Sequence, residues 1–296
     1  MTSDRPAPDA SASVFATVAS PPALPQEDLA ALRAAVAALE RSSLAGRLSS
    51  MAGTPLELLG RALPSVAREM VSAAVSRALK VALRVALTTL PRGESGPRSG
   101  RSHTVLAAMS GAAGGALGLA TLPLELPVST TLLLRAIADE ARREGEDLSD
   151  PEAALACLQV FALGSRTEAD DLASSGYFAV RGALAKTVTE AARLAAGKGL
   201  ADRSAPALVR LTAQIASRFG VAVSQKVAAG AVPVIGALGG AAVNVAFTDH
   251  FRRLARAHFT VRRLERRYGA EPVRALYEEI RTARAPELSH GTRPEA

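Results

Sequence analysis

Aromatic residues and cysteine are scarce in this sequence. Its 296 residues include no Trp, three Tyr, seven Phe and one Cys. A lone cysteine excludes a disulfide within the chain, and Cys157 lies in an apolar run where a small buried side chain is expected. The shortage of rings that stack on bases argues against nucleic acid as a partner.

Lysine is also rare, because 31 of the 35 basic residues are Arg, and the formal net charge is +7. A GC-rich genome produces such arginine usage without any functional reason. A positive net charge nevertheless favours anionic partners, although only through the sign of the charge. Because aromatic side chains that stack on bases are scarce, we expect the acidic lipids of a membrane surface rather than nucleic acid.

A secretory leader is missing from the N-terminal residues. Asp4 and Asp9 interrupt them, and the apolar run Val14–Ala19 is too short for the core of a signal peptide. We therefore expect the protein to be made and retained in the cytoplasm.

Strong helix formers dominate the apolar half of the chain, whereas β-branched runs are few, so we predict an all-α helical bundle. One helix is expected over Glu27–Arg47, ending near Gly46, and a basic amphipathic helix over Pro55–Leu90. Two further helices, divided near Gly164, are expected between Pro151 and about Ala195. Shifts in composition predict a disordered lead over 1–25, N-terminal helices over 26–91, a flexible linker over 92–103, a main helical domain over 104–285 and a disordered tail over 286–296.

Two apolar stretches stand out. Thr104–Leu134 carries one charge, Glu125, and is interrupted by Pro123 and Pro127, while Val227–Thr248 carries none. Because proline breaks a helix, we expect the first stretch to form two helices that meet at a proline-containing turn. Both stretches have basic flanks, so we expect two helical hairpins whose ends stay on the cytoplasmic side if they enter a bilayer.

Glycines form a stripe in each apolar stretch. Small residues on one helix face allow close packing, and such packing occurs both in lipid and inside a soluble bundle. The sequence leaves both settings open. The candidate close-packing residues are Gly111, Gly114, Gly115, Gly118, Gly236, Gly239 and Gly240.

The segment Asp249–Tyr268 is a second amphipathic helix, with arginines on one half and apolar residues such as Leu254 and Leu264 on the other. A helix of this kind can lie on an anionic bilayer, although a solvated charged face is the ordinary explanation. The candidate membrane-surface residues are Arg252, Arg253, Arg256, Arg262, Arg263, Arg266 and Arg267.

No catalytic, cofactor or metal motif can be defended. His250 and His258 share a helix with Asp249 but stand about 12 Å apart along its axis, too far to share an ion without other ligands. Phosphate loops and nucleophile elbows are missing. Glu125 could hold a proton or a cation, cap the turn between the prolines, or pair with an arginine.

Three blocks of this sequence resemble the EcsC family. They are Gly115–Pro127 (GALGLATLPLELP) with Leu134–Glu140 after it, Gly176–Leu184 (GYFAVRGAL), and Val232–Asn244 (VPVIGALGGAAVN) leading into Phe247–Asp249 and the arginine-rich helix. They cover about residues 104 to 268 in order. The family pattern often has Asp where this chain has Glu125. The resemblance implies a helical, membrane-associated protein of unknown biochemistry, named after a member encoded beside an ABC transporter, and it supplies no catalytic residues.

Three functional hypotheses follow. The first is a non-enzymatic cytoplasmic protein at the inner membrane, peripheral or inserted by its hairpins, and accessory to a transporter or an envelope process. The second is a hydrolase-like enzyme, with a site around Glu125 and Arg181, that requires six distant polar residues to converge. The third is a soluble helical scaffold for a protein partner. The six candidate buried polar residues are Glu125, Arg135, Tyr177, Arg181, Asn244 and Asp249.

Overall fold

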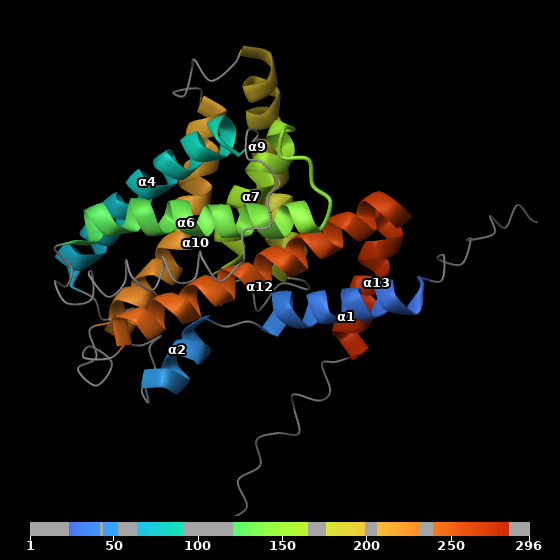
Figure 1. Ribbon diagram of the computed structural model, residues 1–296, viewed down its shortest axis with the longest axis horizontal. Coiled ribbons are helices and arrows are strands. Elements are labelled where there is room, and N and C mark those ends of the chain that lie inside the picture. The colour runs from blue at the N-terminus through green and yellow to red at the C-terminus, as the bar shows by residue number, and fades with distance from the viewer. Residues whose placement is uncertain are drawn as a thin grey trace, which may run out of the picture.

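A computed structural model describes residues 24–41, 44–52, 64–90, 121–164, 176–198, 206–230 and 239–283. These residues form nine α-helices that pack together, and no strand occurs among them. Figure 1 shows the arrangement. In chain order the helices are α1 (Gln26–Arg41), α2 (Leu44–Ala52), α4 (Ser65–Thr88), α6 (Leu122–Arg143), α7 (Pro151–Leu163), α9 (Gly176–Lys198), α10 (Pro206–Gly230), α12 (Gly239–Tyr268) and α13 (Ala270–Ala283).

The all-α prediction is confirmed, and helix α7 forms the centre of the bundle. Every residue from Ala153 to Ala162 is buried, as expected for a helix that is apolar all round. Asp150 caps its start by accepting a hydrogen bond from the Glu152 amide at 2.9 Å, and Pro151 occupies the first turn. Cys157 is fully buried, and burial raises the pKa of its thiol to about 12.

Aromatic rings join α7 to its neighbours. Phe161 packs against Phe219 of α10 and Phe251 of α12, with ring centroids 4.8 and 5.8 Å apart. Phe247 completes the cluster at 4.9 Å from Phe251. Rings in tilted and edge-to-face arrangements at these distances stabilise a core beyond the area they bury.

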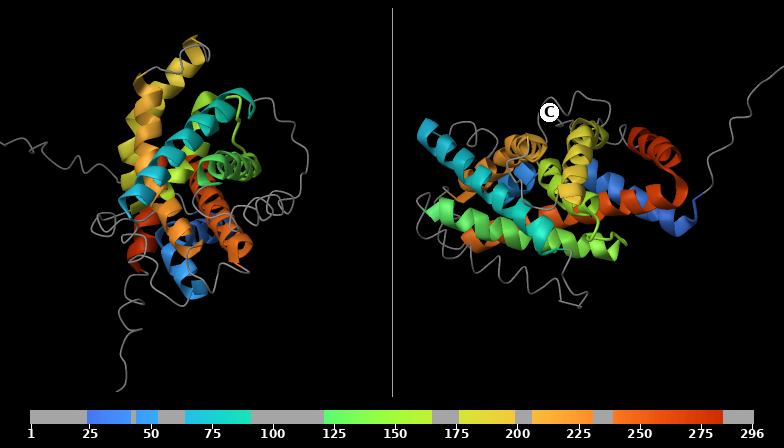
Figure 2. Two further views of the ribbon diagram at one scale, coloured as in Figure 1. Left: turned by 90° about the vertical axis from the view of Figure 1, so that its left-hand side faces the viewer. Right: turned by 90° about the horizontal axis from the view of Figure 1, so that it is seen from above.

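Helices α6 and α12 lie side by side and run in the same direction. Glu140 of α6 pairs with Arg252 and Arg256, and Glu146, just after α6, pairs with Arg262 and Arg266, so the contacts advance together along both helices. Helix α4 crosses α6, and α1 lies beside the C-terminal half of α12 (Figures 1 and 2). Gly145 and Gly269, with φ of +76° and +92°, allow the sharp turns that end α6 and α12.

Several local predictions need correction. Helix α1 ends at Arg41, and Gly46 lies inside α2, so the expected helix over Glu27–Arg47 is divided earlier than the glycine suggested. The turn expected between Pro123 and Pro127 is also wrong, because α6 begins at Leu122 and continues through Pro127. Pro123 lies in the first turn, where the amide that proline removes has no partner within the helix. Pro127 lies inside the helix and costs one backbone hydrogen bond there, so the packing of α6 overrides that local preference.

Other predictions are confirmed or lie outside the described residues. The break near Gly164 is confirmed as the end of α7, and the arginine-rich helix begins earlier than expected, at Gly239. On α4 the basic residues Arg77, Lys80 and Arg84 are exposed, as the amphipathic pattern predicted. The linker, the tail, most of the N-terminal lead and the bend of the second hairpin lie outside the described residues, as do Gly111, Gly114, Gly115, Gly118 and Gly236.

Candidate functional site

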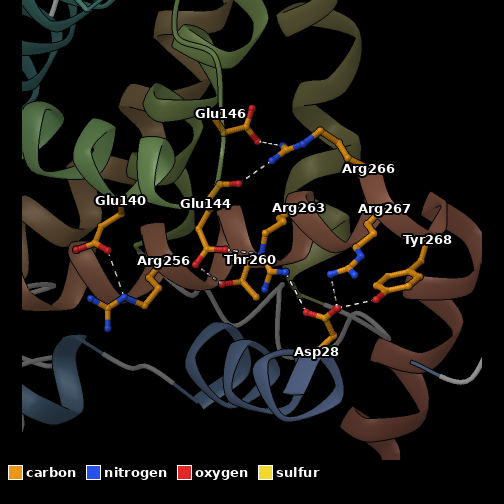
Figure 3. Close-up of polar contacts among 10 residues, drawn as sticks. All are labelled: Asp28, Glu140, Glu144, Glu146, Arg256, Thr260, Arg263, Arg266, Arg267 and Tyr268. Carbon is orange, nitrogen blue, oxygen red and sulfur yellow. Dashed lines mark hydrogen bonds and ion pairs between the residues drawn. The ribbon is translucent and has the colours of Figure 1, made fainter. Parts of the chain in front are cut away.

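The seven arginines singled out on α12 all contact carboxylates of the same chain. Figure 3 shows the middle of this network, with carboxylates from α6 and the loop after it on one side and Asp28 of α1 on the other. The distances between paired nitrogen and oxygen atoms run from 2.7 to 3.3 Å, apart from the very close pair of Arg266 and Glu146. The carboxylate partners are Asp28, Glu140, Glu144, Glu146 and Asp249.

Three of these carboxylates are buried, and the arginines hold them ionised. Burial alone would raise the pKa of Glu140 and Glu146, yet the guanidinium groups of Arg256 and Arg262 hold both pKa values below the ordinary value of 4.5. Asp28 accepts hydrogen bonds from Tyr268 and Arg263, which lower its pKa below 3.8. A buried carboxylate without partners would be costly, so the network fastens α12 to α6 and α1.

Membrane contact by the seven arginines stays a prediction, and the structure adds that each has a partner within the protein. Asp249 lies only four residues from Arg253, whereas the other four carboxylates were missed because they lie 112 to 239 residues from their arginines in the chain. The acidic run between Asp139 and Asp150 was the available signal, since its charge complements that of the arginine-rich helix.

The two apolar stretches meet at the other end of α6. Lys226 Nζ near the end of α10 donates to Glu125 Oε1 at 3.2 Å, and both side chains are largely buried. The same ammonium lies 5.5 Å from the ring centroid of Phe247 on α12. Of the three roles considered for Glu125, the structure shows a charge pair, with lysine in place of arginine.

Large apolar side chains are exposed beside this pair. Leu124 is 72% exposed and Val128 is 55% exposed, one turn apart on α6. At 100° per residue, Leu124, Val128 and the exposed Arg135 lie within about 40° of one another on the helical wheel. We call these three residues the α6 stripe; Leu124 and Val128 were not singled out from the sequence.

Among the helices that the structure describes, none combines the length and apolarity required to cross a membrane. Groups of three or more His, Cys, Asp or Glu side chains that could hold a metal ion are likewise missing from those residues. His250 and His258 point instead to separate buried partners: His250 Nε2 donates to the Gly164 carbonyl, and His258 Nδ1 lies 3.0 Å from the Tyr177 hydroxyl.

The EcsC protein family model matches residues 26–264, which is most of the chain. The chain belongs to the EcsC family. The match begins at α1 and thus reaches further toward the N-terminus than the three sequence blocks, in agreement with the packing of α1 and α4 onto the later helices. No curated protein and no solved structure matches the chain at a significant level.

The six polar residues proposed for an enzymatic site of this EcsC protein fall into separate contacts. Glu125 pairs with Lys226 at one end of α6, whereas Asp249 pairs with Arg47 and Arg253. Arg135 is exposed on α6 and Asn244 is buried on α12. Distribution over separate ion pairs is the arrangement that argues against one catalytic pocket.

Tyr177 and Arg181 do lie together, in a buried polar chain. Arg181 binds Glu265 through two bonds of 2.8 and 2.9 Å, and its Nη1 also donates to the Tyr177 hydroxyl at 3.1 Å. The Tyr177 hydroxyl also lies 3.0 Å from His258 Nδ1, so these two groups share a buried hydrogen bond. Burial raises the pKa of Tyr177 and lowers that of His258 far below 6.5, which makes both groups neutral structural partners.

Proposed function

We propose that this EcsC protein is a non-enzymatic, peripheral membrane protein that docks on an anionic bilayer at the cytoplasmic face. The α6 stripe carries the proposal. It places two exposed apolar side chains, Leu124 and Val128, in line with a cationic one, Arg135. Apolar side chains that enter the interface next to a basic residue that meets lipid phosphate are typical of helices that lie on membranes.

Two further features support this location. The stripe adjoins the Glu125–Lys226 pair, so it lies where both glycine-rich apolar stretches of the sequence approach one another. The apolar composition of both stretches supports the same location. Docking of this kind would bring the protein beside membrane transporters, the setting that the family resemblance implies for an accessory role.

The test is co-sedimentation of the full chain with vesicles of phosphatidylcholine alone or mixed with phosphatidylglycerol, at low and at high salt. We expect binding to the anionic vesicles at low salt. Salt should weaken the contribution of Arg135, while the apolar contribution persists. Protein that stays in the supernatant with both vesicles at low salt would overturn the proposal.

Two substitutions locate the binding surface. Leu124→Asp combined with Val128→Asp should weaken binding at least about tenfold, because each buried side chain of this size contributes about 1.5 kcal/mol or more. Val209→Asp combined with Val221→Asp is the matched control, since both valines are exposed, at 53% and 36%, but lie on α10. Equal loss of binding in the control would place the surface elsewhere.

A further inference from the structure

Three arginines converge on one buried carboxylate between α6 and α12. Glu140 Oε1 accepts from Arg143 at 2.8 Å and from Arg252 at 3.0 Å, and Oε2 accepts from Arg256 at 3.2 Å. Only 2% of the Glu140 side chain is exposed. We call these four residues the Glu140 cluster.

The charges of the Glu140 cluster do not balance. Three guanidinium groups face a single carboxylate, so two positive charges remain. The neighbouring acidic residues along the chain do not cancel them, because Asp139 pairs with Arg142 and Glu144 pairs with Arg263. The balance leaves the cluster suited to a group that carries two negative charges.

Hydrogen-bond donors remain available on the outer side of the cluster. Arg143 bonds to Glu140 through Nη1, so its Nε and Nη2 have no partner among the described residues. Arg256 bonds through Nε, so its Nη1 and Nη2 have no partner among them either. These side chains are 47% and 63% exposed. Guanidinium groups with free forked donors bind phosphate oxygens in pairs.

Glu140 fixes both arginines before any ligand arrives. Its carboxylate is buried and ionised, and it lies on α6 opposite α12, so the two guanidinium groups are held by packed helices. Side chains ordered in advance lose less conformational entropy on binding. Arg143 follows Arg135 by two turns on α6, the helix that carries the α6 stripe.

We propose that Arg143 and Arg256 bind the phosphate of a phosphomonoester lipid headgroup, of which phosphatidic acid is the simplest. A phosphomonoester presents three terminal oxygens and close to two negative charges, which match the free donors and the excess charge of the Glu140 cluster. A phosphodiester headgroup offers one charge. This inference rests on the proposed membrane docking and adds a headgroup preference to it.

The test compares vesicles that contain phosphatidic acid with vesicles that contain phosphatidylglycerol, at matched surface charge. The full chain should bind the phosphatidic acid vesicles about fivefold more tightly, a difference of about 1 kcal/mol. Arg143→Gln combined with Arg256→Gln should abolish that preference and keep the binding to phosphatidylglycerol. Each single variant, which leaves two arginines on Glu140, should lower the preference in part.

Arg77→Gln combined with Arg210→Gln is the control, because it removes the same charge from exposed positions on α4 and α10. It should keep the preference. Equal binding of the two anionic lipids by the full chain would overturn this inference and leave the docking proposal intact, whereas no binding to any vesicle would overturn both. Thermal stabilisation by inorganic phosphate, lost in the Arg143 and Arg256 variant but without a lipid preference, would overturn the lipid source in favour of a free anion.

Discussion

Two buried histidines on α12 stay uncharged in the folded protein. His250 donates through Nε2 to the Gly164 carbonyl at 3.0 Å, and burial lowers its pKa to about 4. His258 is fully buried beside Tyr177, with its pKa well below 6.5. Both residues therefore favour the folded state only at a pH at which a histidine side chain is neutral.

The histidines predict a loss of stability in mild acid. Their folded pKa values lie below the unfolded value of 6.5, so their contribution is complete above that pH and falls as the pH drops from 6.5 toward 4. His250 alone should cost about 3 kcal/mol over this interval. Urea unfolding at pH 7.5, 6 and 5 measures the effect, and His250→Asn should flatten the profile. A wild-type profile that is already flat would contradict the prediction.

Gly164, at the end of α7, predicts a steric effect. A Cβ atom at this position would lie 2.2 Å from two ring carbons of Phe251, which is fully buried in the aromatic cluster. Gly164→Ala should destabilise the protein by about 2 kcal/mol or more, because the ring cannot move without disturbing the core.

The control for that substitution is Gly182→Ala on α9, where no atom lies within 4 Å of the added carbon. Because alanine favours a helix over glycine, this change should stabilise the protein by up to about 1 kcal/mol. Thermal unfolding distinguishes the two variants, and equal effects at both positions would show that contact with Phe251 does not decide the cost.

At the scale of elements, helix α1 depends on one buried carboxylate. Asp28 accepts hydrogen bonds from Arg263 at 2.9 Å, Arg267 at 3.2 Å and Tyr268 at 2.6 Å, all at the C-terminal end of α12. Asp28→Asn keeps the shape and removes the charge, so we expect a loss of about 2 kcal/mol. Faster hydrogen exchange should appear over α1.

Glu27→Gln is the control for Asp28→Asn, because the neighbouring Glu27 is exposed. Its exchange over α1 should match that of the wild type. Unchanged exchange in the Asp28 variant would indicate that the apolar face of α1, including Leu32 and Val36, is sufficient to hold the helix.

The sequence predicted elements better than it predicted their contacts. Hydrophobic spacing located α4 and α12 because local periodicity determines which face of a helix is buried. The break between α1 and α2 and the continuation of α6 through Pro127 were not predictable from local signals. Helix breakers act as preferences that tertiary packing can override.

In the candidate sites, too, the residues were easier to predict than their partners. The arginines of α12 were recognised from their spacing, but their carboxylates were not, since those pairs exist only because α6 and α12 run side by side. Lys226 was likewise hidden as the partner of Glu125, 101 residues away. Such contacts follow from the path of the chain, which local sequence does not determine.

At the scale of the whole molecule, the two ends of α6 differ in the side chains that they carry. Its C-terminal end joins the arginine network, and its N-terminal end carries Leu124 and Val128. The network makes the fold sensitive to strong acid. A carboxylate whose pKa is lowered in the folded state stabilises the protein at any pH above its ordinary pKa. That contribution is lost as the pH falls through the pKa of the folded state.

Glu140 allows this acid sensitivity to be measured. Glu140→Gln leaves three guanidinium groups without their buried charge partner and should cost about 3 kcal/mol at pH 6. The difference from the wild type should shrink as the pH falls below about 4.5, because the carboxylate of the unfolded wild-type chain then takes up a proton. It should be lost once the pH has also passed the lower pKa of Glu140 in the folded state. Unfolding free energies of both proteins between pH 6 and 2.5 test this. A difference that is constant with pH would contradict an ionised Glu140 in the fold.

The contact between Asp28 and the end of α12 joins residues 235 to 240 positions apart. A ribosome releases the N-terminal end of a chain first, so α1 emerges long before Arg263 and Tyr268 have been synthesised. During that interval the apolar face of α1 has no partner on α12. At least 235 further residues must therefore be synthesised after Asp28 before α1 can take its native place on α12.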